Sequence, residues 1–340
     1  MWSYILDVLR NVFHLTKLQP TLPVEEVPLL FREPGVKSGY RPTKKDPTYY
    51  VKSAFQVNNE TVNVWTHAIG FCIILLKTLS YLPFYLDRDP RYWPMLGFGV
   101  CSLIFLALST FAHAVHSASP LMHYLCFQID YAGVAQFTLG GSLLMSYLQV
   151  SEEIVTSYFP YWVFPVNILL SFNDFLCCTI AKLKYRRPYP FARKLWQVIP
   201  LTTHASFSVF VLMGPRFFKC FRSPSCHMFW EEPGLAFVFL ASIAGIICAV
   251  FFSSHIPEKI WPGKFDFIGQ GHQIFHVSSV ILVIFQFQAA ELDIVYHHRV
   301  NMTHLPCWQI PVSICLLLSV CCFTIYVLFP YTLRRAKEEE

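Results

Sequence analysis

The amino-acid sequence predicts an all-α fold, a polytopic bundle of membrane helices. Of its 340 residues 54% are hydrophobic and only 14% are charged, against roughly 25% charged residues in an ordinary soluble domain. Long apolar segments recur along the chain, and each is long enough for a helix that crosses the hydrocarbon core of a bilayer. The number of these segments predicts a core of seven helices followed by an eighth transmembrane helix.

The chain starts with a segment that we expect on the cytoplasmic side of the membrane, residues 1–62. Apolar residues recur at helical spacing over residues 1–19 with basic residues between them, which is typical of an amphipathic helix in the membrane interface. Residues 20–50 are rich in proline and charge and should form an ordered loop on the membrane surface. The predicted divisions that follow are a seven-helix core at 63–290, an extracellular loop at 291–308, the eighth helix at 309–333 and a cytoplasmic tail at 334–340.

The expected transmembrane helices are delimited by their apolar runs. In chain order they are 65–86, 93–116, 121–148, 154–183, 195–213, 235–256, 267–290 and 310–333. Lys77 lies within the first, and its long side chain is expected to extend toward the interface. Because ionisable residues inside a membrane span are costly, each of the others needs a partner or a function.

The distribution of basic residues predicts the orientation of the bundle. With the N-terminus inside, the inner segments hold nineteen Lys and Arg residues and the outer loops six, and such an excess stays on the cytoplasmic side. Both termini are therefore predicted to be cytoplasmic. In this topology the sequon at Asn301 lies outside, where it can be glycosylated, and so do Cys220 and Cys226, which we expect to form a disulfide.

Two histidines four residues apart lie at the start of the seventh helix. His272 and His276 share one helix face, and the topology places His113, near the end of the second helix, at a similar depth. Three neutral imidazoles with an open fourth position match a catalytic zinc site. Asp130 of the third helix is expected beside it, as a general base for a water molecule whose pKa the Zn²⁺ ion lowers.

Other readings of these polar residues stay open. His116 competes with His113 for the ligand role, and the histidines could instead form a polar network between helices. His116 and His67 are otherwise candidates for supporting the ligands. Asp174 is expected to be a helix–helix hydrogen-bond partner or a cavity residue, and His204 a hydrogen-bonded packing residue.

The basic loop 182–194 has two interpretations. Its basic residues can keep the loop on the cytoplasmic side and attract anionic lipid, or they can bind a cytosolic signalling protein. The net charge of +5 is modest and does not favour nucleic acid as a partner.

Three blocks of the sequence resemble the signatures of a known family. Ser109-x-x-x-His113, Ile129-Asp-Tyr-Ala-Gly133 and His272-Gln-Ile-Phe-His276 are similar in order and spacing to those of the progestin and adipoQ receptors, a family within a wider group of membrane hydrolases that includes alkaline ceramidases. The resemblance covers residues 26–290. The segments 27–34, 38–42, 63–67 and 184–190 look like the membrane progestin receptor branch, nearest its alpha and beta members.

The resemblance implies zinc bound by His113, His272 and His276, with Asp130 beside the bound water and Ser109 nearby. It also implies a plasma-membrane receptor for progestogens that signals through an inhibitory heterotrimeric G protein. No Asp-Arg-Tyr follows the third helix and no Asn-Pro-x-x-Tyr closes the seventh, so that coupling rests on the resemblance alone. The residues themselves favour an alternative, a zinc-dependent intramembrane amidohydrolase that acts on a sphingolipid such as ceramide.

Overall fold

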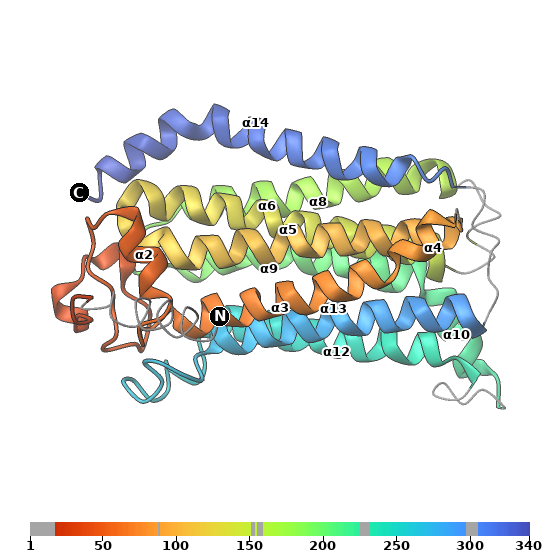
Figure 1. Cartoon of the computed structure of the whole chain (residues 1–340), viewed down its shortest axis with the longest axis horizontal. Coiled ribbons are helices and arrows are strands. Elements are labelled where there is room, and N and C mark those ends of the chain that lie inside the picture. The colour runs from red at the N-terminus through yellow and green to blue at the C-terminus, as the bar shows by residue number, and fades with distance from the viewer. Residues whose placement is uncertain (1–17, 88, 151–153, 155–158, 225–230, 297–304) are drawn as a thin grey trace, which may run out of the picture.

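The computed structural model describes residues 18–87, 89–150, 154, 159–224, 231–296 and 305–340, and within them the chain is all-α (Figure 1). The predicted interfacial helix over residues 1–19 falls almost entirely outside this part, as do Asn301 and Cys226. Cys220 takes part in a disulfide, and its pairing with Cys226 stays a prediction. The prediction of a helical membrane bundle is confirmed.

The described helices follow the predicted apolar segments closely. Their bounds are α2 Pro47–Ser53, α3 Thr61–Ser80, α4 Leu82–Leu86, α5 Trp93–Val115, α6 Pro120–Leu144, α8 Phe159–Lys184, α9 Phe191–Ser206, α10 Gly214–Arg222, α12 Pro233–Ser254, α13 Gly271–Tyr296 and α14 Gln309–Lys337. A π-helical segment continues α6 at Met145–Gln149, and another continues α9 at Phe207–Leu212. The predicted eighth transmembrane helix corresponds to α14.

Among the described residues, seven helices are long and apolar enough to cross a membrane. They include α14, which lies at the edge of the bundle against α6, α8 and α5 (Figure 1). The remaining long helix, α6, carries many buried polar side chains, among them Gln128, Asp130, Gln136 and Ser142. Because these polar groups point into the protein, α6 lies inside the bundle although its sequence is less apolar than that of its neighbours.

Small residues let the central helices approach one another. A Cβ atom added at Gly140 of α6 would lie 2.6 Å from the Cβ of Cys101 on α5, and one added at Gly99 of α5 would lie 2.3 Å from Thr78 Oγ1 of α3. Glycine at such positions allows close backbone contact in membrane bundles.

Lys77 has a partner within the bundle that the sequence does not predict. Its ammonium donates a hydrogen bond of 2.6 Å to Glu291 on α13.

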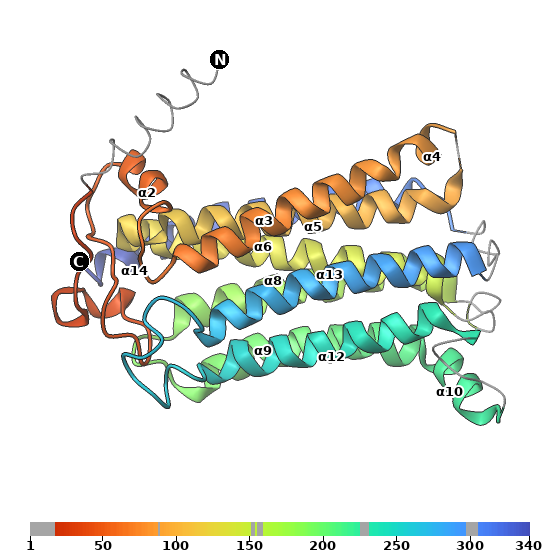
Figure 2. The same ribbon diagram turned by 60° about the horizontal axis from the view of Figure 1, so that its bottom comes forward.

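One end of the bundle is covered by the segment before the first span, residues 18–60, which we call the cap (Figures 1 and 2). Lys37 N and Ser38 Oγ of the cap donate to the two carboxylate oxygens of Asp266, at 2.8 and 2.6 Å. Glu33 of the cap pairs with Arg187 in the loop between α8 and α9. These contacts connect the cap to the segment before α13 and to the loop between α8 and α9. The C-terminus lies at the same end of the bundle (Figure 1).

Candidate metal centre and its cavity

The first turn of α13 is held in place by two side chains that bind its free backbone amides. Gly269, at φ +88°, lets the chain turn into the helix. Its N–H and that of Gln270 point to Gln273 Oε1, at 2.7 and 3.3 Å, and Gly271 N donates to Glu258 Oε2 at 2.7 Å. An acidic side chain at this position also favours the positive end of the helix dipole. The two histidines of α13 therefore start from a fixed point.

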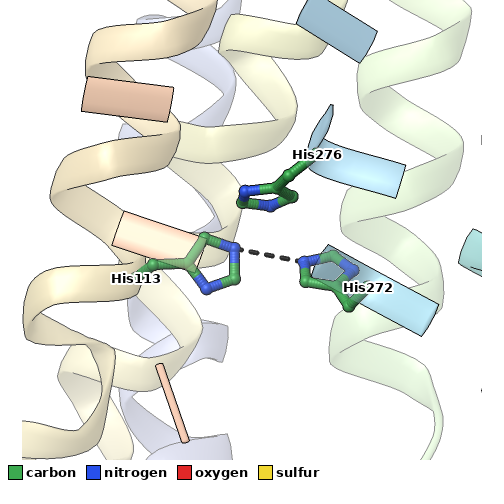
Figure 3. A group of neighbouring side chains, drawn as sticks. All are labelled: His113, His272 and His276. Carbon is green, nitrogen blue, oxygen red and sulfur yellow. Dashed lines mark hydrogen bonds between the residues drawn. The ribbon is translucent and has the colours of Figure 1, made fainter. Parts of the chain in front are cut away.

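The structure brings three of the predicted ligands together. His113 of α5 faces His272 and His276 of α13 (Figure 3). One ring nitrogen from each of the three residues lies within 4.8 Å of the other two. His113 Nε2 and His272 Nε2 are 3.2 Å apart. Nitrogens bound tetrahedrally to zinc at ~2.0–2.1 Å would lie roughly 3.3 Å from each other. The spacing of this pair therefore fits a shared ion.

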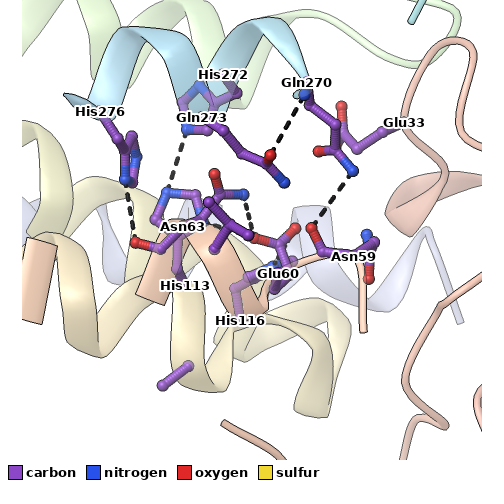
Figure 4. Close-up of polar contacts among 12 residues, drawn as sticks. Glu33, Asn59, Glu60, Asn63, His113, His116, Gln270, His272, Gln273 and His276 are labelled. Atoms are coloured by element: carbon purple, nitrogen blue, oxygen red, sulfur yellow. Dashed lines mark hydrogen bonds and ion pairs between the residues drawn. The ribbon is translucent and has the colours of Figure 1, made fainter. Parts of the chain in front are cut away.

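Hydrogen bonds fix which ring nitrogen of each histidine is free. His113 Nδ1 lies 2.8 Å from Glu60 Oε2, and His276 Nδ1 lies 3.1 Å from the carbonyl oxygen of Asn63 (Figure 4). Both acceptors require a proton on Nδ1, so a neutral ring carries its lone pair on Nε2. The buried His276 Nε2 has no hydrogen-bond partner. Such an orphaned acceptor, aimed at two other imidazoles, fits a metal ligand.

Glu60 is the functional residue that the sequence analysis missed. It is buried at the residue before α3, where its Oε2 accepts hydrogen bonds from His113 Nδ1 and Asn63 Nδ2, both at 2.8 Å. Burial raises the pKa of the Glu60 carboxyl, but the interactions with His113 and His116 outweigh it and hold that pKa well below its usual range. The only sequence signal was an acidic residue directly before a membrane span.

A second group of potential ligands shares His113 but uses other atoms. Glu60, His113 and His116 also lie within ligand range of one another, with His116 Nε2 at 3.4 Å from Glu60 Oε1. Glu60 lies at Nδ1 of the His113 ring, whereas His272 lies at Nε2. His113 therefore links a carboxylate on one side to the two α13 histidines on the other.

The cap holds the His113 end of α5 directly. The buried guanidinium of Arg41 donates to the carbonyl oxygens of His113 and Ala114, at 2.8 and 2.5 Å. A cation at the last carbonyls of a helix satisfies them and favours the helix dipole. This contact fixes the depth of His113 relative to α13.

The other predicted residues surround the three histidines. His67 stacks on His276 with ring centroids 3.7 Å apart, and its Nε2 lies 3.2 Å from Ser279 Oγ. Asp130 lines the same cavity as His113 and His272. Its Oδ1 is buried without a partner, while Ser109 is a hydrogen-bond partner of the same carboxyl. The structure therefore brings His67, Asp130 and Ser109 close to the three histidines, and their roles at the site stay predictions.

Asp174 belongs to a second polar group, toward the middle of the bundle. Its Oδ2 accepts from His204 Nδ1 at 2.7 Å, and His204 Nε2 lies 2.8 Å from Ser142 Oγ. Ser142 Oγ is in turn 2.5 Å from Ser208 Oγ. We call these four residues the relay. From the sequence, Asp174 is expected to be a helix–helix hydrogen-bond partner or a cavity residue and His204 a hydrogen-bonded packing residue, and the structure shows that each is the partner of the other.

A cavity of about 490 Å³ connects the two polar groups. Its wall is formed by α5, α6, α8, α9, α12 and α13, and it reaches residues of the cap at one end. Most of the wall is apolar or aromatic, with polar groups in a few places. Residues that line it include Phe105, Phe137, Leu201, Phe252, His113, His272, Ser142, His204 and Ser208.

Comparison with known proteins gives consistent results. The family model described as haemolysin-III related matches residues 55–287. Membrane progestin receptor beta of Mus musculus is 34% identical over 291 residues, which cover 84% of this chain and 79% of the relative. The Homo sapiens protein of the same name is 35% identical over 288 residues, covering 82% and 77%. Membrane progestin receptor alpha-B of Danio rerio is 32% identical, covering 83% and 79%.

Proposed function

Because this chain belongs to the haemolysin-III-related family, which includes the progestin and adipoQ receptors, we propose that it is a membrane receptor for progestin steroids. The observation that carries the proposal is the likeness to membrane progestin receptor beta, which extends over more than four fifths of the chain. The progestin specificity is inferred from the names of these relatives. The size, lining and polar groups of the cavity also support a steroid ligand.

The cavity has the size and lining that a steroid needs. Its volume of about 490 Å³ falls within the ~300–1,000 Å³ of small-molecule sites, which are mostly apolar with a few placed polar groups. Aromatic and aliphatic side chains such as Phe105, Phe137 and Leu201 suit the fused rings. An apolar ligand can also enter such a site from the bilayer.

The relay supplies a polar anchor within this apolar wall. His204 donates through Nδ1 to Asp174, so Nε2 accepts the proton of Ser142. The hydroxyl of Ser208 then donates to Ser142 Oγ, at 2.5 Å, or to the carbonyl oxygen of His204, at 3.1 Å. Rotation of this hydroxyl can turn its proton toward a ligand, because Ser142, His204 and Ser208 all line the cavity. A ketone oxygen of a progestin is an acceptor without a proton, which matches a donor of this kind.

Saturation binding of radiolabelled progesterone to the purified full chain tests this proposal. Ser208→Ala should weaken binding roughly tenfold, because one hydrogen bond contributes about 1.4 kcal/mol. Ser242→Ala is a matched control, since Ser242 lines the same cavity and, like Ser208, donates to a carbonyl oxygen of its own helix, but it does not belong to the relay. The receptor proposal fails if the wild-type protein shows no saturable progesterone binding.

We also propose that His113, His272 and His276 bind Zn²⁺ and that the centre retains hydrolase chemistry toward a sphingolipid amide. The favouring observation is that the orphaned Nε2 of His276 lies within ligand range of His113 and His272, which line the cavity together with Asp130, whose Oδ1 also has no partner. A zinc ion supplies a Lewis acid that polarises a carbonyl group. The residues of the chain would orient the amide, and Asp130 would take up a proton.

Ceramide turnover and progesterone binding, measured on the same His272→Ala protein, separate the two activities. Lost turnover with retained steroid binding would assign the histidines to hydrolysis alone. Turnover by purified wild type that remains unchanged after complete zinc removal would contradict the hydrolase proposal.

Location and signalling complete the proposal. We place both termini in the cytoplasm on the basis of the basic-residue distribution, and the protein in the plasma membrane on the basis of the family resemblance. A C-terminal tag should then be protected from protease on intact cells. Coupling to an inhibitory heterotrimeric G protein is carried by the family resemblance, and progesterone-dependent nucleotide exchange in a reconstituted mixture would test it.

A further inference from the structure

Three cationic side chains surround one tyrosine ring at the capped end of the cavity. The Tyr189 ring centroid lies 3.8 Å from Arg193 Cζ, 4.7 Å from Arg187 Cζ and 6.0 Å from Lys182 Nζ. All four residues line the cavity. We call them the Tyr189 cluster. From the sequence, these residues are only part of the basic loop 182–194, with the two interpretations of topology plus attraction to anionic lipid, or binding of a cytosolic signalling protein.

The cluster holds more buried positive charge than its protein partners neutralise. Arg187 pairs with Glu33. In the part of the chain that the structure describes, Arg193 has no carboxylate within ion-pair distance, and it is 7% exposed with Nε lacking any partner. Lys182, 2% exposed, points its ammonium at His123 Nε2 at 2.8 Å. A guanidinium stays charged in proteins, and a buried charge without a counter-ion is strongly unfavourable.

Contact with the Tyr189 ring offsets part of this cost for Arg193, because a cation over an aromatic face is attracted to it. A ring cannot neutralise a charge, however, and it holds three cations here. The helix start adds to the positive potential: α9 begins at Phe191, two residues before Arg193, and no side chain caps it. A helix N-terminus and an arginine fork together form a site for an anion.

The cavity beyond the cluster is mostly apolar, with the relay among its few polar groups. Along α9 its lining passes from Arg193 through Val198 and Leu201 to Phe210. Those 17 residue steps span about 25 Å at the ~1.5 Å rise of a helix. Cations at one end of such a wall suit an amphiphile, with an anionic head at the cluster and an apolar tail along α9.

We infer that the Tyr189 cluster binds the phosphate head group of a membrane lipid whose acyl chain lies in the cavity. Phosphate fits better than carboxylate, since it carries up to two charges and the cluster has two cations, Lys182 and Arg193, beyond the one paired with Glu33. The planar guanidinium binds phosphate oxygens in pairs and an ammonium acts as a point charge. The inference does not depend on the steroid proposal, because it rests on the cations of the Tyr189 cluster and not on the relay, although the acyl chain would share the wall along α9 with a steroid.

Binding to the purified full chain in a neutral detergent tests the inference with three probes. They are lysophosphatidic acid, the monoacylglycerol with the same acyl chain, and inorganic phosphate. Wild type should bind lysophosphatidic acid at least tenfold more tightly than the monoacylglycerol, and inorganic phosphate at millimolar concentration should not shift the melting temperature. Arg193→Gln should reduce lysophosphatidic acid affinity tenfold or more.

Arg186→Gln is the matched control, because Arg186 lies in the same loop but its side chain is 60% exposed and pairs with Glu338 at the surface. It should change the affinity less than twofold. If Arg193→Gln does not fold, Lys182→Gln replaces it, since Lys182 belongs to the same cluster and lines the same end of the cavity. An equal loss in the Arg186 variant would indicate general surface attraction and overturn the inference. So would unchanged affinity in the cluster variant, or a phosphate ion that alone reproduces the thermal shift.

Discussion

Glu60→Gln tests whether a carboxylate outside the three-histidine group tunes its metal affinity. The substitution keeps the size of the side chain and an oxygen that can accept from His113 Nδ1, but it removes the negative charge. In the wild type this carboxylate bonds both His113 and Asn63 at 2.8 Å. Glutamine weakens the hold on the His113 ring and makes its Nε2 a poorer electron donor.

Two estimates of the effect agree. A hydrogen bond to a charged group contributes about 1.5–3 kcal/mol, and ~1.4 kcal/mol corresponds to tenfold in an equilibrium constant. Replacing the hydrogen-bond partner of a metal-binding histidine likewise costs roughly 10–100-fold in metal affinity. We therefore expect Glu60→Gln to bind Zn²⁺ 10–100 times more weakly than wild type, with the fold retained.

Zinc affinity is measured by competition with a chromophoric chelator, and zinc content by elemental analysis. His272→Ala and His116→Ala run beside the Glu60 variant, because they distinguish the two ligand groups that share His113. Loss of stoichiometric zinc in His272→Ala, with retention in His116→Ala, is the expected pattern. The reverse pattern would assign the ion to Glu60, His113 and His116, and a Glu60→Gln affinity within threefold of wild type would refute the reasoning about the carboxylate.

Three further predictions concern stability, measured by thermal or denaturant unfolding in detergent. Gly140→Ala should lower the free energy of unfolding by about 1–3 kcal/mol, because its Cβ would overlap α5; Gly245→Ala, which has open space around the added Cβ, should change it by less than about 0.5 kcal/mol, and equal losses would contradict the packing. Asp293→Asn should cost about 1.5–3 kcal/mol, since the buried guanidinium of Arg216 on α10 loses one carboxylate and keeps Glu232, whereas Glu338→Gln, at an exposed carboxylate, should leave the stability nearly unchanged. Burial raises the pKa of Glu33, but its guanidinium partner outweighs this and lowers it. The ion pair therefore stabilises the fold above the unfolded pKa of ~4.3 and is lost as pH falls below it. Wild type should be more stable than Glu33→Gln by about 1 kcal/mol at pH 7, and a gap that persists at pH 3 would contradict this.

Hydropathy and helical spacing were enough to predict the bundle, because apolar runs of this length have few alternatives in a membrane. They also predicted that His272 and His276 share a face, and topology placed His113 level with them. Glu60 escaped because it precedes its helix, where no periodicity marks which way a side chain points. The pairing of Asp174 with His204 depends on how α8 packs against α9, and spacing within one helix carries no information about that.

The Tyr189 cluster illustrates the same limit for charge. A count of basic residues in the loop 182–194 describes a surface, and the sequence gives no sign that Arg193 turns inward while Arg186 stays exposed. Side-chain burial at a helix end is decided by the neighbouring helices. Composition predicts where charge occurs along the chain, but only tertiary structure shows which charges lack a partner.

The cap connects the interior of the bundle to the water outside it. Glu33 and Glu60 belong to this membrane-surface segment, yet both also line the cavity. A ligand that favours one arrangement of these carboxylates therefore shifts the conformational equilibrium of the cap. By thermodynamic linkage, a protein that binds the cap in that arrangement raises the affinity for the ligand by the same factor. The binding of a lipid-soluble ligand and the binding of a water-soluble partner would then be coupled through Glu33 and Glu60 at one end of the bundle. Such coupling does not require the helices to move along their whole length.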